Sequence, residues 1–147
     1  MRYRRTDSKG RFRHIEEAER FLSELKSARP EPRLLEIWMA DLGDRGGSVQ
    51  SGRRPVLIVS NDKNNVYSSV VNVMPMTTKM NKRNLPCHVE LYNYERFGLN
   101  APSTIMVEQL TILDKSNLIF RIGKIDDPEV LNEIYKAMTI QFPVLVS

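Results

Sequence analysis

Apolar residues recur along the chain in two rhythms, and each rhythm predicts one kind of element. Short apolar runs that are bounded by Gly, Pro, Asn or Asp, some of them alternating with polar residues, predict β-strands. Six segments follow this pattern: residues 35–42, 55–60, 69–76, 87–91, 104–110 and 119–125. Several short strands with short connections predict a small, curled antiparallel sheet or barrel.

The second rhythm places apolar residues three and four apart and predicts two helices. The first covers residues 14–27 and ends before a pair of prolines. The second covers about residues 127–141, with Asp126 or Asp127 as its N-cap and Pro128 in its first turn. The expected fold is therefore mainly β, with a helix that closes the chain.

The chain divides near residue 34. Residues 1–33 contain the basic N-terminus and the first predicted helix, and we expect them to form an extension that packs on the domain surface or on a partner. Residues 34–147 contain all the predicted strands and the closing helix. The whole chain of 147 residues is long enough for one domain with a modest core.

The composition says more about the cellular compartment than about the chemistry of the protein. The net charge of +4 suits a polyanionic partner, but many proteins without such a partner are equally basic. A single cysteine, Cys87, excludes an internal disulfide and agrees with a reducing compartment. No apolar run approaches the roughly 20 residues that span a bilayer. We therefore expect a cytoplasmic protein without a membrane segment.

Residue spacing also argues against metal and cofactor chemistry. The two histidines, His14 and His88, lie far apart, and neither a cysteine pair nor a His-x-x-x-His spacing occurs. The chain has no P-loop and no GxGxxG motif. We expect no cofactor and no metal, and Cys87 is predicted to be a small packed residue rather than a nucleophile. Two possibilities remain: phosphate chemistry that uses arginine and hydroxyl groups, or no catalysis.

Two arginines stand where a glycine-rich polar loop, residues 43–52, meets a predicted strand. Pro55 biases Arg54 towards an extended backbone, and the strand that follows holds its direction. A guanidinium group presents a planar fork that suits a phosphate, so Arg53 and Arg54 are candidate phosphate contacts. The alternative is a solvated pair of charges beside a long hairpin connection.

Two further stretches carry polar groups at strand positions. Pro75 cannot donate to a sheet ladder, so it predicts a sheet edge or a bulge, and Thr77 after it is positioned to point a hydroxyl out of the sheet. Glu108 and Gln109 end an apolar strand, where Glu108 is placed to pair with an arginine and Gln109 to contact a ligand. The alternatives are that Thr77 is an ordinary β-branched strand residue and that Glu108 and Gln109 simply form an exposed strand end.

Taken together, these stretches resemble the MazF/PemK toxin family. The resemblance runs from about Leu35 to Phe142, and its most specific parts are the Arg-Pro-Val entry to the strand and the segment from Glu-Gln to Asp-Lys. The matching stretches are residues 38–42, 47–50, 52–62, 76–78, 85–90 and 107–115. Two positions depart from the family pattern: Val49 replaces a glutamate, and Thr111 replaces an arginine.

The resemblance implies an SH3-like barrel of about five to seven antiparallel strands, a homodimer, and an endoribonuclease toxin that a cognate antitoxin inhibits. It implies metal-independent cleavage of single-stranded RNA, such as mRNA, to a 2′,3′-cyclic phosphate and a 5′-hydroxyl. Arg54 and Thr77 match the family's catalytic positions. The residues expected along the RNA path are Ser48, Gln50, Arg53, Ser103 and Gln109.

Two other classes stay open at this point. One is a non-catalytic toxin of the same fold, similar to the CcdB gyrase poisons, which would bind a protein and leave RNA intact. The other is a basic nucleic-acid-binding module. The combination of Arg54 with Thr77 favours the nuclease over both, because neither alternative needs a guanidinium and a hydroxyl beside one phosphate.

Overall fold

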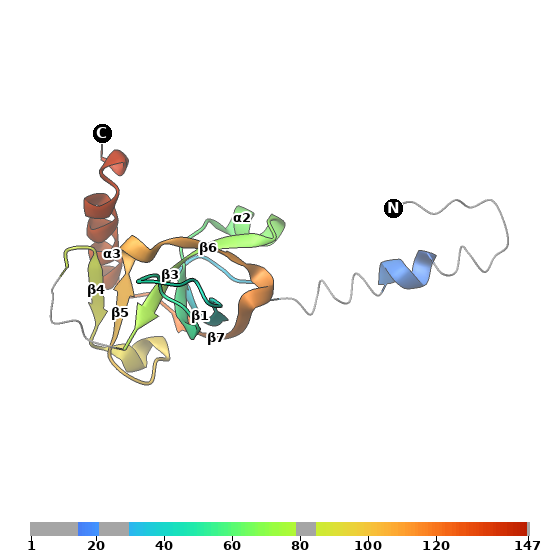
Figure 1. Cartoon of the computed structure of the whole chain (residues 1–147), viewed down its shortest axis with the longest axis horizontal. Helices are drawn as coiled ribbons and strands as arrows, with labels where there is room; N and C mark the ends of the chain where they lie inside the picture. The colour runs from blue at the N-terminus through green and yellow to red at the C-terminus, as the bar shows by residue number, and fades with distance from the viewer. Residues whose placement is uncertain (1–14, 21–29, 79–84, 147) are drawn as a thin grey trace.

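A seven-stranded antiparallel sheet forms the main part of the protein, and the C-terminal helix packs beside it (Figure 1). The computed structural model describes residues 15–20, 30–78 and 85–146. The strands are β1 (Glu36–Asp41), β2 (Arg53–Ile58), β3 (Val70–Thr77), β4 (His88–Leu91), β5 (Ser103–Met106), β6 (Thr111–Asp114) and β7 (Leu118–Lys124). The α-helices with both ends inside the described residues are α2 (Asp62–Tyr67) and α3 (Pro128–Gln141). Short 3₁₀ turns are η1 (Tyr94–Phe97), η2 (Val107–Gln109), η3 (Lys115–Asn117) and η4 (Pro143–Leu145).

Strand β3 organises the sheet because three strands pair with it. Strand β2 pairs along one side, while β6 and β5 share the other side, β6 opposite Val70–Val73 and β5 opposite Met76 and Thr77. The turn η2 carries the chain from β5 to β6. Pro75 lies where the ladder on this side is interrupted. Strand β3 is therefore an interior strand. Of the two structures predicted at Pro75, a sheet edge or a bulge, the edge is wrong, and the ladder is interrupted there instead.

The sheet buries apolar side chains on both of its faces, because consecutive residues of a strand point to opposite sides. One cluster includes Ile37, Leu57 and Met74, and Ile134 and Ala137 of α3 close it. The other cluster lies on the opposite face and contains Trp38, Ala40, Leu42, Val56, Ile58, Val71, Val73, Leu113 and Leu118. A curled sheet with a core on each face matches the predicted barrel with a closing helix.

Helix α3 confirms the closing helix almost residue for residue. The side chain of Asp127 accepts a hydrogen bond from the backbone N–H of Glu129 at 2.9 Å, so Asp127 rather than Asp126 is the N-cap. Pro128 occupies the first turn, where its missing N–H costs nothing. Ile134 and Ala137 are the helix residues that become fully buried.

Two elements were missed by pattern, and one predicted strand is too long. The segment predicted as one strand over 104–110 is β5 followed by η2, and β6 after it was not predicted. Asn61 is the N-cap of helix α2, and its side chain accepts a hydrogen bond from the N–H of Asn64. Asn and Asp are favoured both in turns and at helix N-caps, so the pattern indicated only the end of the preceding strand here.

The N-terminal extension is described only in part. Residues 15–20 are helical, and residues 16–20 are exposed. The remainder of the helix predicted over 14–27 lies outside the described residues. Within the part of the chain that the structure covers, no helix is long and apolar enough to cross a membrane.

Candidate functional site

The sheet register brings Arg54 and Thr77 to the same end of neighbouring strands. The paired part of β2 and β3 ends with Val56 opposite Pro75, and Arg54 and Thr77 each lie two residues beyond that pair, at the same end of the two antiparallel strands. The Arg54 guanidinium donates from Nη1 to the carbonyl of Met76 at 3.4 Å, directly beside Thr77. Its Nε donates to the carbonyl of Ser51 at 3.0 Å. Arg54 is therefore a held, half-buried cation rather than a solvated one.

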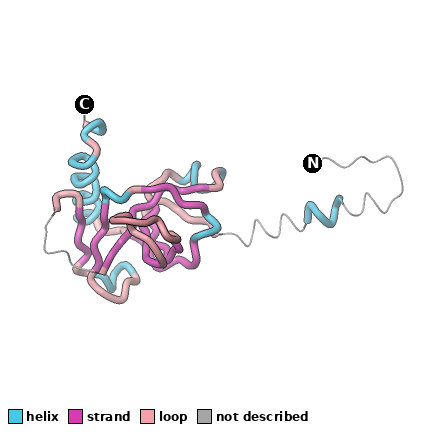
Figure 2. Tube along the Cα trace, viewed as in Figure 1, coloured by secondary structure: helices cyan, strands magenta, loops and turns pink. Residues whose placement is uncertain are grey.

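The loop of residues 43–52 lies across the strands and is closed at its base (Figure 2). The N–H of Gly52 donates to the carbonyl of Gly43 at 2.8 Å, and the N–H of Leu42 donates to the carbonyl of Gly52 at 2.9 Å. Gly43 and Gly52 both have positive φ, which a glycine adopts without strain. Backbone hydrogen bonds thus hold the two ends of the predicted loop together next to Arg53 and Arg54.

Gln109 ties this loop to the 3₁₀ turn η2. Its Oε1 accepts from the N–H of Gln50 at 3.4 Å, and its Nε2 donates to the carbonyl of Ser48 at 3.4 Å. Three residues that the sequence separates, Ser48, Gln50 and Gln109, therefore come together. Gln109 contacts the backbone atoms of Ser48 and Gln50. The side chains of Ser48 and Gln50 take no part in these hydrogen bonds.

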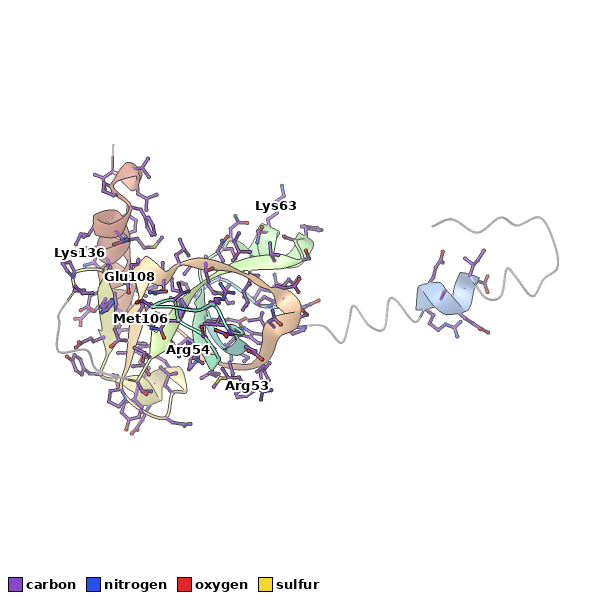
Figure 3. All side chains as sticks on the ribbon, in the orientation of Figure 1. Arg53, Arg54, Lys63, Met106, Glu108 and Lys136 are labelled. Atoms are coloured by element: carbon purple, nitrogen blue, oxygen red, sulfur yellow. The ribbon has the colours of Figure 1, made fainter. Side chains whose placement is uncertain are left out.

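The other two predicted contact residues have different surroundings. Arg53 is exposed at the start of β2, opposite Asp41 of β1, and Figure 3 shows it with Arg54 at that end of the strand. Ser103 has only 2% of its surface exposed, and its hydroxyl donates to the carbonyl of Ala101 at 3.0 Å. In this chain Ser103 is an interior residue at the start of β5, not part of the exposed site.

Arg45, near the start of the loop, fastens it to β6. Its side chain donates to the carbonyl of Leu42 at 2.9 Å, to Oγ1 of Thr111 at 2.8 Å and to the carbonyl of Ile112 at 3.3 Å. Hydrogen bonds from a charged donor contribute about 1.5–3 kcal/mol each when they are shielded. The sequence did not single out this anchor, because it depends on residues of two distant segments.

Arg45→Ala should therefore loosen the loop. We expect amide hydrogen exchange over residues 43–52 to become about tenfold faster, since about 1.4 kcal/mol less protection corresponds to a factor of ten. Exchange measured by mass spectrometry tests this. Arg121→Ala is the matched control, because Arg121 pairs with Glu36 on β1 and its loss should leave the loop unchanged. Equal protection in wild type and Arg45→Ala would contradict the anchor.

A second cluster joins residues that the sequence analysis treated separately. Cys87 Sγ donates to Oε2 of Glu108 at 3.1 Å, and His88 Nε2 bonds to Oε1 of the same carboxylate at 2.7 Å. Among the described residues, the partners of Glu108 are Cys87 and His88 rather than an arginine. Burial, with Glu108 as the second cause, raises the pKa of the Cys87 thiol. The protonated thiol agrees with a packed rather than a nucleophilic cysteine.

These three residues also bear on metal binding. A sulfur, an imidazole nitrogen and a carboxylate oxygen of Cys87, His88 and Glu108 lie within 4.8 Å of one another. Spacing along the chain gave no sign of this, because Glu108 arrives from a segment about twenty residues later. A register prediction that paired the strand of residues 87–91 with that of residues 104–110 would have found it.

Known structures superpose on this chain over most of its length. The MazF toxin of Deinococcus radiodurans superposes with a TM-score of 0.64 at 19% identity, covering 78% of this chain and 98% of that one. An endoribonuclease in complex with its cognate antitoxin, from a mycobacterial species, superposes with a TM-score of 0.59 at 23% identity, covering 77% and 96%. At these identities the likeness defines the fold, which is that of the MazF toxins.

The sequence comparison goes further than the fold. Residues 33–142 match the profile of the family described as PemK-like, MazF-like toxin of type II toxin-antitoxin system. Endoribonuclease EndoA of Bacillus subtilis is 34% identical over 110 residues, which cover 75% of this chain and 93% of that protein. The chain belongs to the PemK/MazF toxin family. The resemblance that the motifs indicated is confirmed.

Proposed function

We propose that this chain is a cytoplasmic toxin endoribonuclease that cleaves single-stranded RNA at short sequence motifs without a metal ion. The observation that carries the proposal is the guanidinium of Arg54, held by two backbone carbonyls at the strand end that carries Thr77. Family membership and the name of the B. subtilis relative support the same activity.

The chemistry needs little beyond a positioned cation and hydroxyl. The substrate's own 2′-hydroxyl gives up its proton to water as its oxygen attacks the adjacent phosphorus, the bond from phosphorus to the 5′-oxygen breaks, and the leaving 5′-oxygen takes up a proton from water. The products are a 2′,3′-cyclic phosphate and a 5′-hydroxyl. Arg54 stabilises the charge that builds on the non-bridging oxygens, and it keeps its proton throughout. Thr77 supplies a hydrogen bond that orients the phosphate.

The loop residues extend this site along an RNA strand. Arg53 is exposed beside Arg54 and is placed to contact a neighbouring phosphate. Ser48, Gln50 and Gln109 lie together across the loop and η2, where side-chain hydroxyl and amide groups suit base edges. Because Ser103 is buried, we assign it no direct contact with RNA and leave it as an interior support of β5.

Two protein partners belong to the proposal. One is a second copy of the chain in a two-fold homodimer. The other is a cognate antitoxin, because one structural neighbour is an endoribonuclease bound to its own. Arg45, Arg53 and Arg54 gather on or beside one loop, so we propose that a disordered acidic segment of the antitoxin occupies the RNA path by charge complementarity.

Incubation of the purified chain with a long single-stranded RNA in excess EDTA tests the activity. We expect fragments whose 5′ ends carry a hydroxyl and map to one recurring short motif. An RNA with a single 2′-deoxy substitution at a mapped cut should remain intact there, because it lacks the attacking oxygen, while its other cuts persist. Intact RNA, cleavage that EDTA abolishes, or cleavage at the deoxy position would overturn the proposal.

A further inference from the structure

The cluster of Cys87, His88 and Glu108 lies at the junction of β4, β5 and η2. The β4–β5 register pairs His88 with Met106, and the N–H of Val107 donates to the carbonyl of Cys87 at 3.1 Å. This pairing delivers Glu108, two residues after Met106, to the start of β4. Figure 3 shows Met106 and Glu108 on this stretch, beside α3. The three side chains are thus positioned by backbone pairing rather than by chance surface contact.

We propose that this cluster is a binding site for a divalent transition-metal ion of the zinc type. The donors would be Sγ of Cys87, Nε2 of His88 and one carboxylate oxygen of Glu108. A thiolate and an imidazole select zinc, cobalt or a similar ion over magnesium and calcium, which prefer oxygen donors alone. The site is independent of the proposed cleavage chemistry, which uses Arg54 and Thr77.

The geometry needs only a small adjustment. A tetrahedral ion at about 2.0–2.3 Å from each donor spaces its ligands about 3.3–3.8 Å apart. The hydrogen-bonded separations are 3.1 Å for Sγ to Oε2 and 2.7 Å for Nε2 to Oε1. An outward swing of the Glu108 carboxylate therefore opens space beside both donors, and the ion draws together the three ligand atoms, which lie within 4.8 Å of one another. The ion would replace the thiol proton, which is released to solvent, and the imidazole would bind through Nε2 as its neutral tautomer with the proton on Nδ1.

Burial also suits a bound ion. The side chain of His88 is 8% exposed and Cys87 is 8% exposed, so most water is excluded from two of the donors. Glu108 is 23% exposed and opens the cluster to solvent. That opening gives an entry path and a place for a water as fourth ligand. Three protein ligands plus a water hold an ion firmly without a closed structural cage.

An ion here would clamp β4 to η2. His88 is the first residue of β4, Cys87 immediately precedes it, and Glu108 comes from η2. The hydrogen bond from the N–H of Val107 to the carbonyl of Cys87 holds these two segments together. Gln109, the neighbour of Glu108, holds the loop of residues 43–52. A bound ion would thus rigidify the turn from which the loop is held, and would raise the melting temperature of the full chain.

Cobalt substitution tests the proposal directly. The full chain, reduced and freed of metal by a chelator that is then removed, is titrated with Co²⁺ and followed by absorbance. We expect a thiolate-to-cobalt charge-transfer band together with visible bands of four-coordinate cobalt, saturating at one ion per chain. Added Zn²⁺ should displace the cobalt and remove both features. This readout is spectroscopic, so it stands or falls separately from RNA cleavage.

Variants identify the ligands. Cys87→Ser should lose the charge-transfer band, and His88→Gln and Glu108→Gln should each weaken Zn²⁺ binding at least about 100-fold, because even partners outside the first coordination sphere typically cost 10- to 100-fold. Glu90→Gln is the matched control, since Glu90 lies on β4 but bonds to Tyr92. Circular dichroism confirms that each variant is folded.

Two results would overturn the metal site. One is a wild-type chain that shows no charge-transfer band at millimolar Co²⁺. The other is binding that persists unchanged in folded Cys87→Ser and Glu108→Gln, which would place the ion elsewhere. In both cases the cluster would be a hydrogen-bonded structural contact, and cleavage in EDTA would be unaffected.

Discussion

Arg54→Ala should slow RNA cleavage about 100- to 1,000-fold while the protein stays folded. Removing one preorganised group that stabilises transition-state charge typically has this effect on the rate. Arg54 meets the requirement for preorganisation because Ser51 and Met76 carbonyls hold its guanidinium before any substrate arrives. The loss should appear mainly in kcat, since the charge on the non-bridging oxygens is greatest in the transition state.

Single-turnover cleavage of an RNA with one mapped site measures this loss. Arg54→Lys should recover only part of the rate, because an ammonium group lacks the planar fork that spans two phosphate oxygens. Arg121→Ala removes a cation from β7, where Arg121 pairs with Glu36, and should cleave at the wild-type rate. A folded Arg54→Ala that cleaves as fast as wild type would remove Arg54 from the chemistry.

The predicted strands whose apolar runs are buried agree best with the structure. Residues 55–60 were predicted from Val-Leu-Ile-Val, and β2 buries Val56, Leu57 and Ile58 completely. Such a run leaves the chain little choice but an interior strand. The closing helix was equally clear because Asp127, Pro128 and the spacing of Ile134 and Ala137 all indicate the same element.

The elements that were missed are those set by tertiary contacts. Strand β6 has only four residues, and Ile112 is 61% exposed, so it carries no clear alternation. Strand β6 forms because η2 carries the chain along β3. β5 pairs with Met76 and Thr77 of β3, and β6 pairs with residues 70–73 of the same strand. No local pattern records such a shift.

The sequence named candidate residues for the site but not the contacts that hold them. Arg54 and Thr77 could be named from sequence, and the structure places them at one sheet end. The anchors that hold the site, Arg45 on Thr111 and Gln109 on the loop, span more than fifty residues of sequence. The cluster at Glu108 spans about twenty residues and also depends on the pairing of separate strands. Such contacts follow from strand register, which the pattern of apolar residues does not determine across long connections.

Gly123→Ala should destabilise the protein by about 3 kcal/mol, which for a chain of this size lowers the melting temperature by about 10 °C. Gly123 lies in β7, opposite Ile37 of β1. A Cβ at Gly123 would stand 2.0 Å from the carbonyl oxygen of Phe97, closer than any two such atoms can approach. The methyl group therefore forces one backbone segment away from the other.

Neither backbone segment can yield cheaply. The Phe97 side chain is 1% exposed in the core, and the N–H of Gly98 donates to the carbonyl of Glu95, so the carbonyl of Phe97 is held on both sides.

Gly46→Ala is the control: Gly46 also lacks a side chain, but open space surrounds its Cβ position, and only its φ of +71° opposes the change. That strain costs about 1–2 kcal/mol. Thermal unfolding of both variants at one protein concentration separates the steric clash from the strain. If Gly123→Ala melted at or above the temperature of Gly46→Ala, β7 would be free to move away from η1, and the close packing of these two segments would not stabilise the fold.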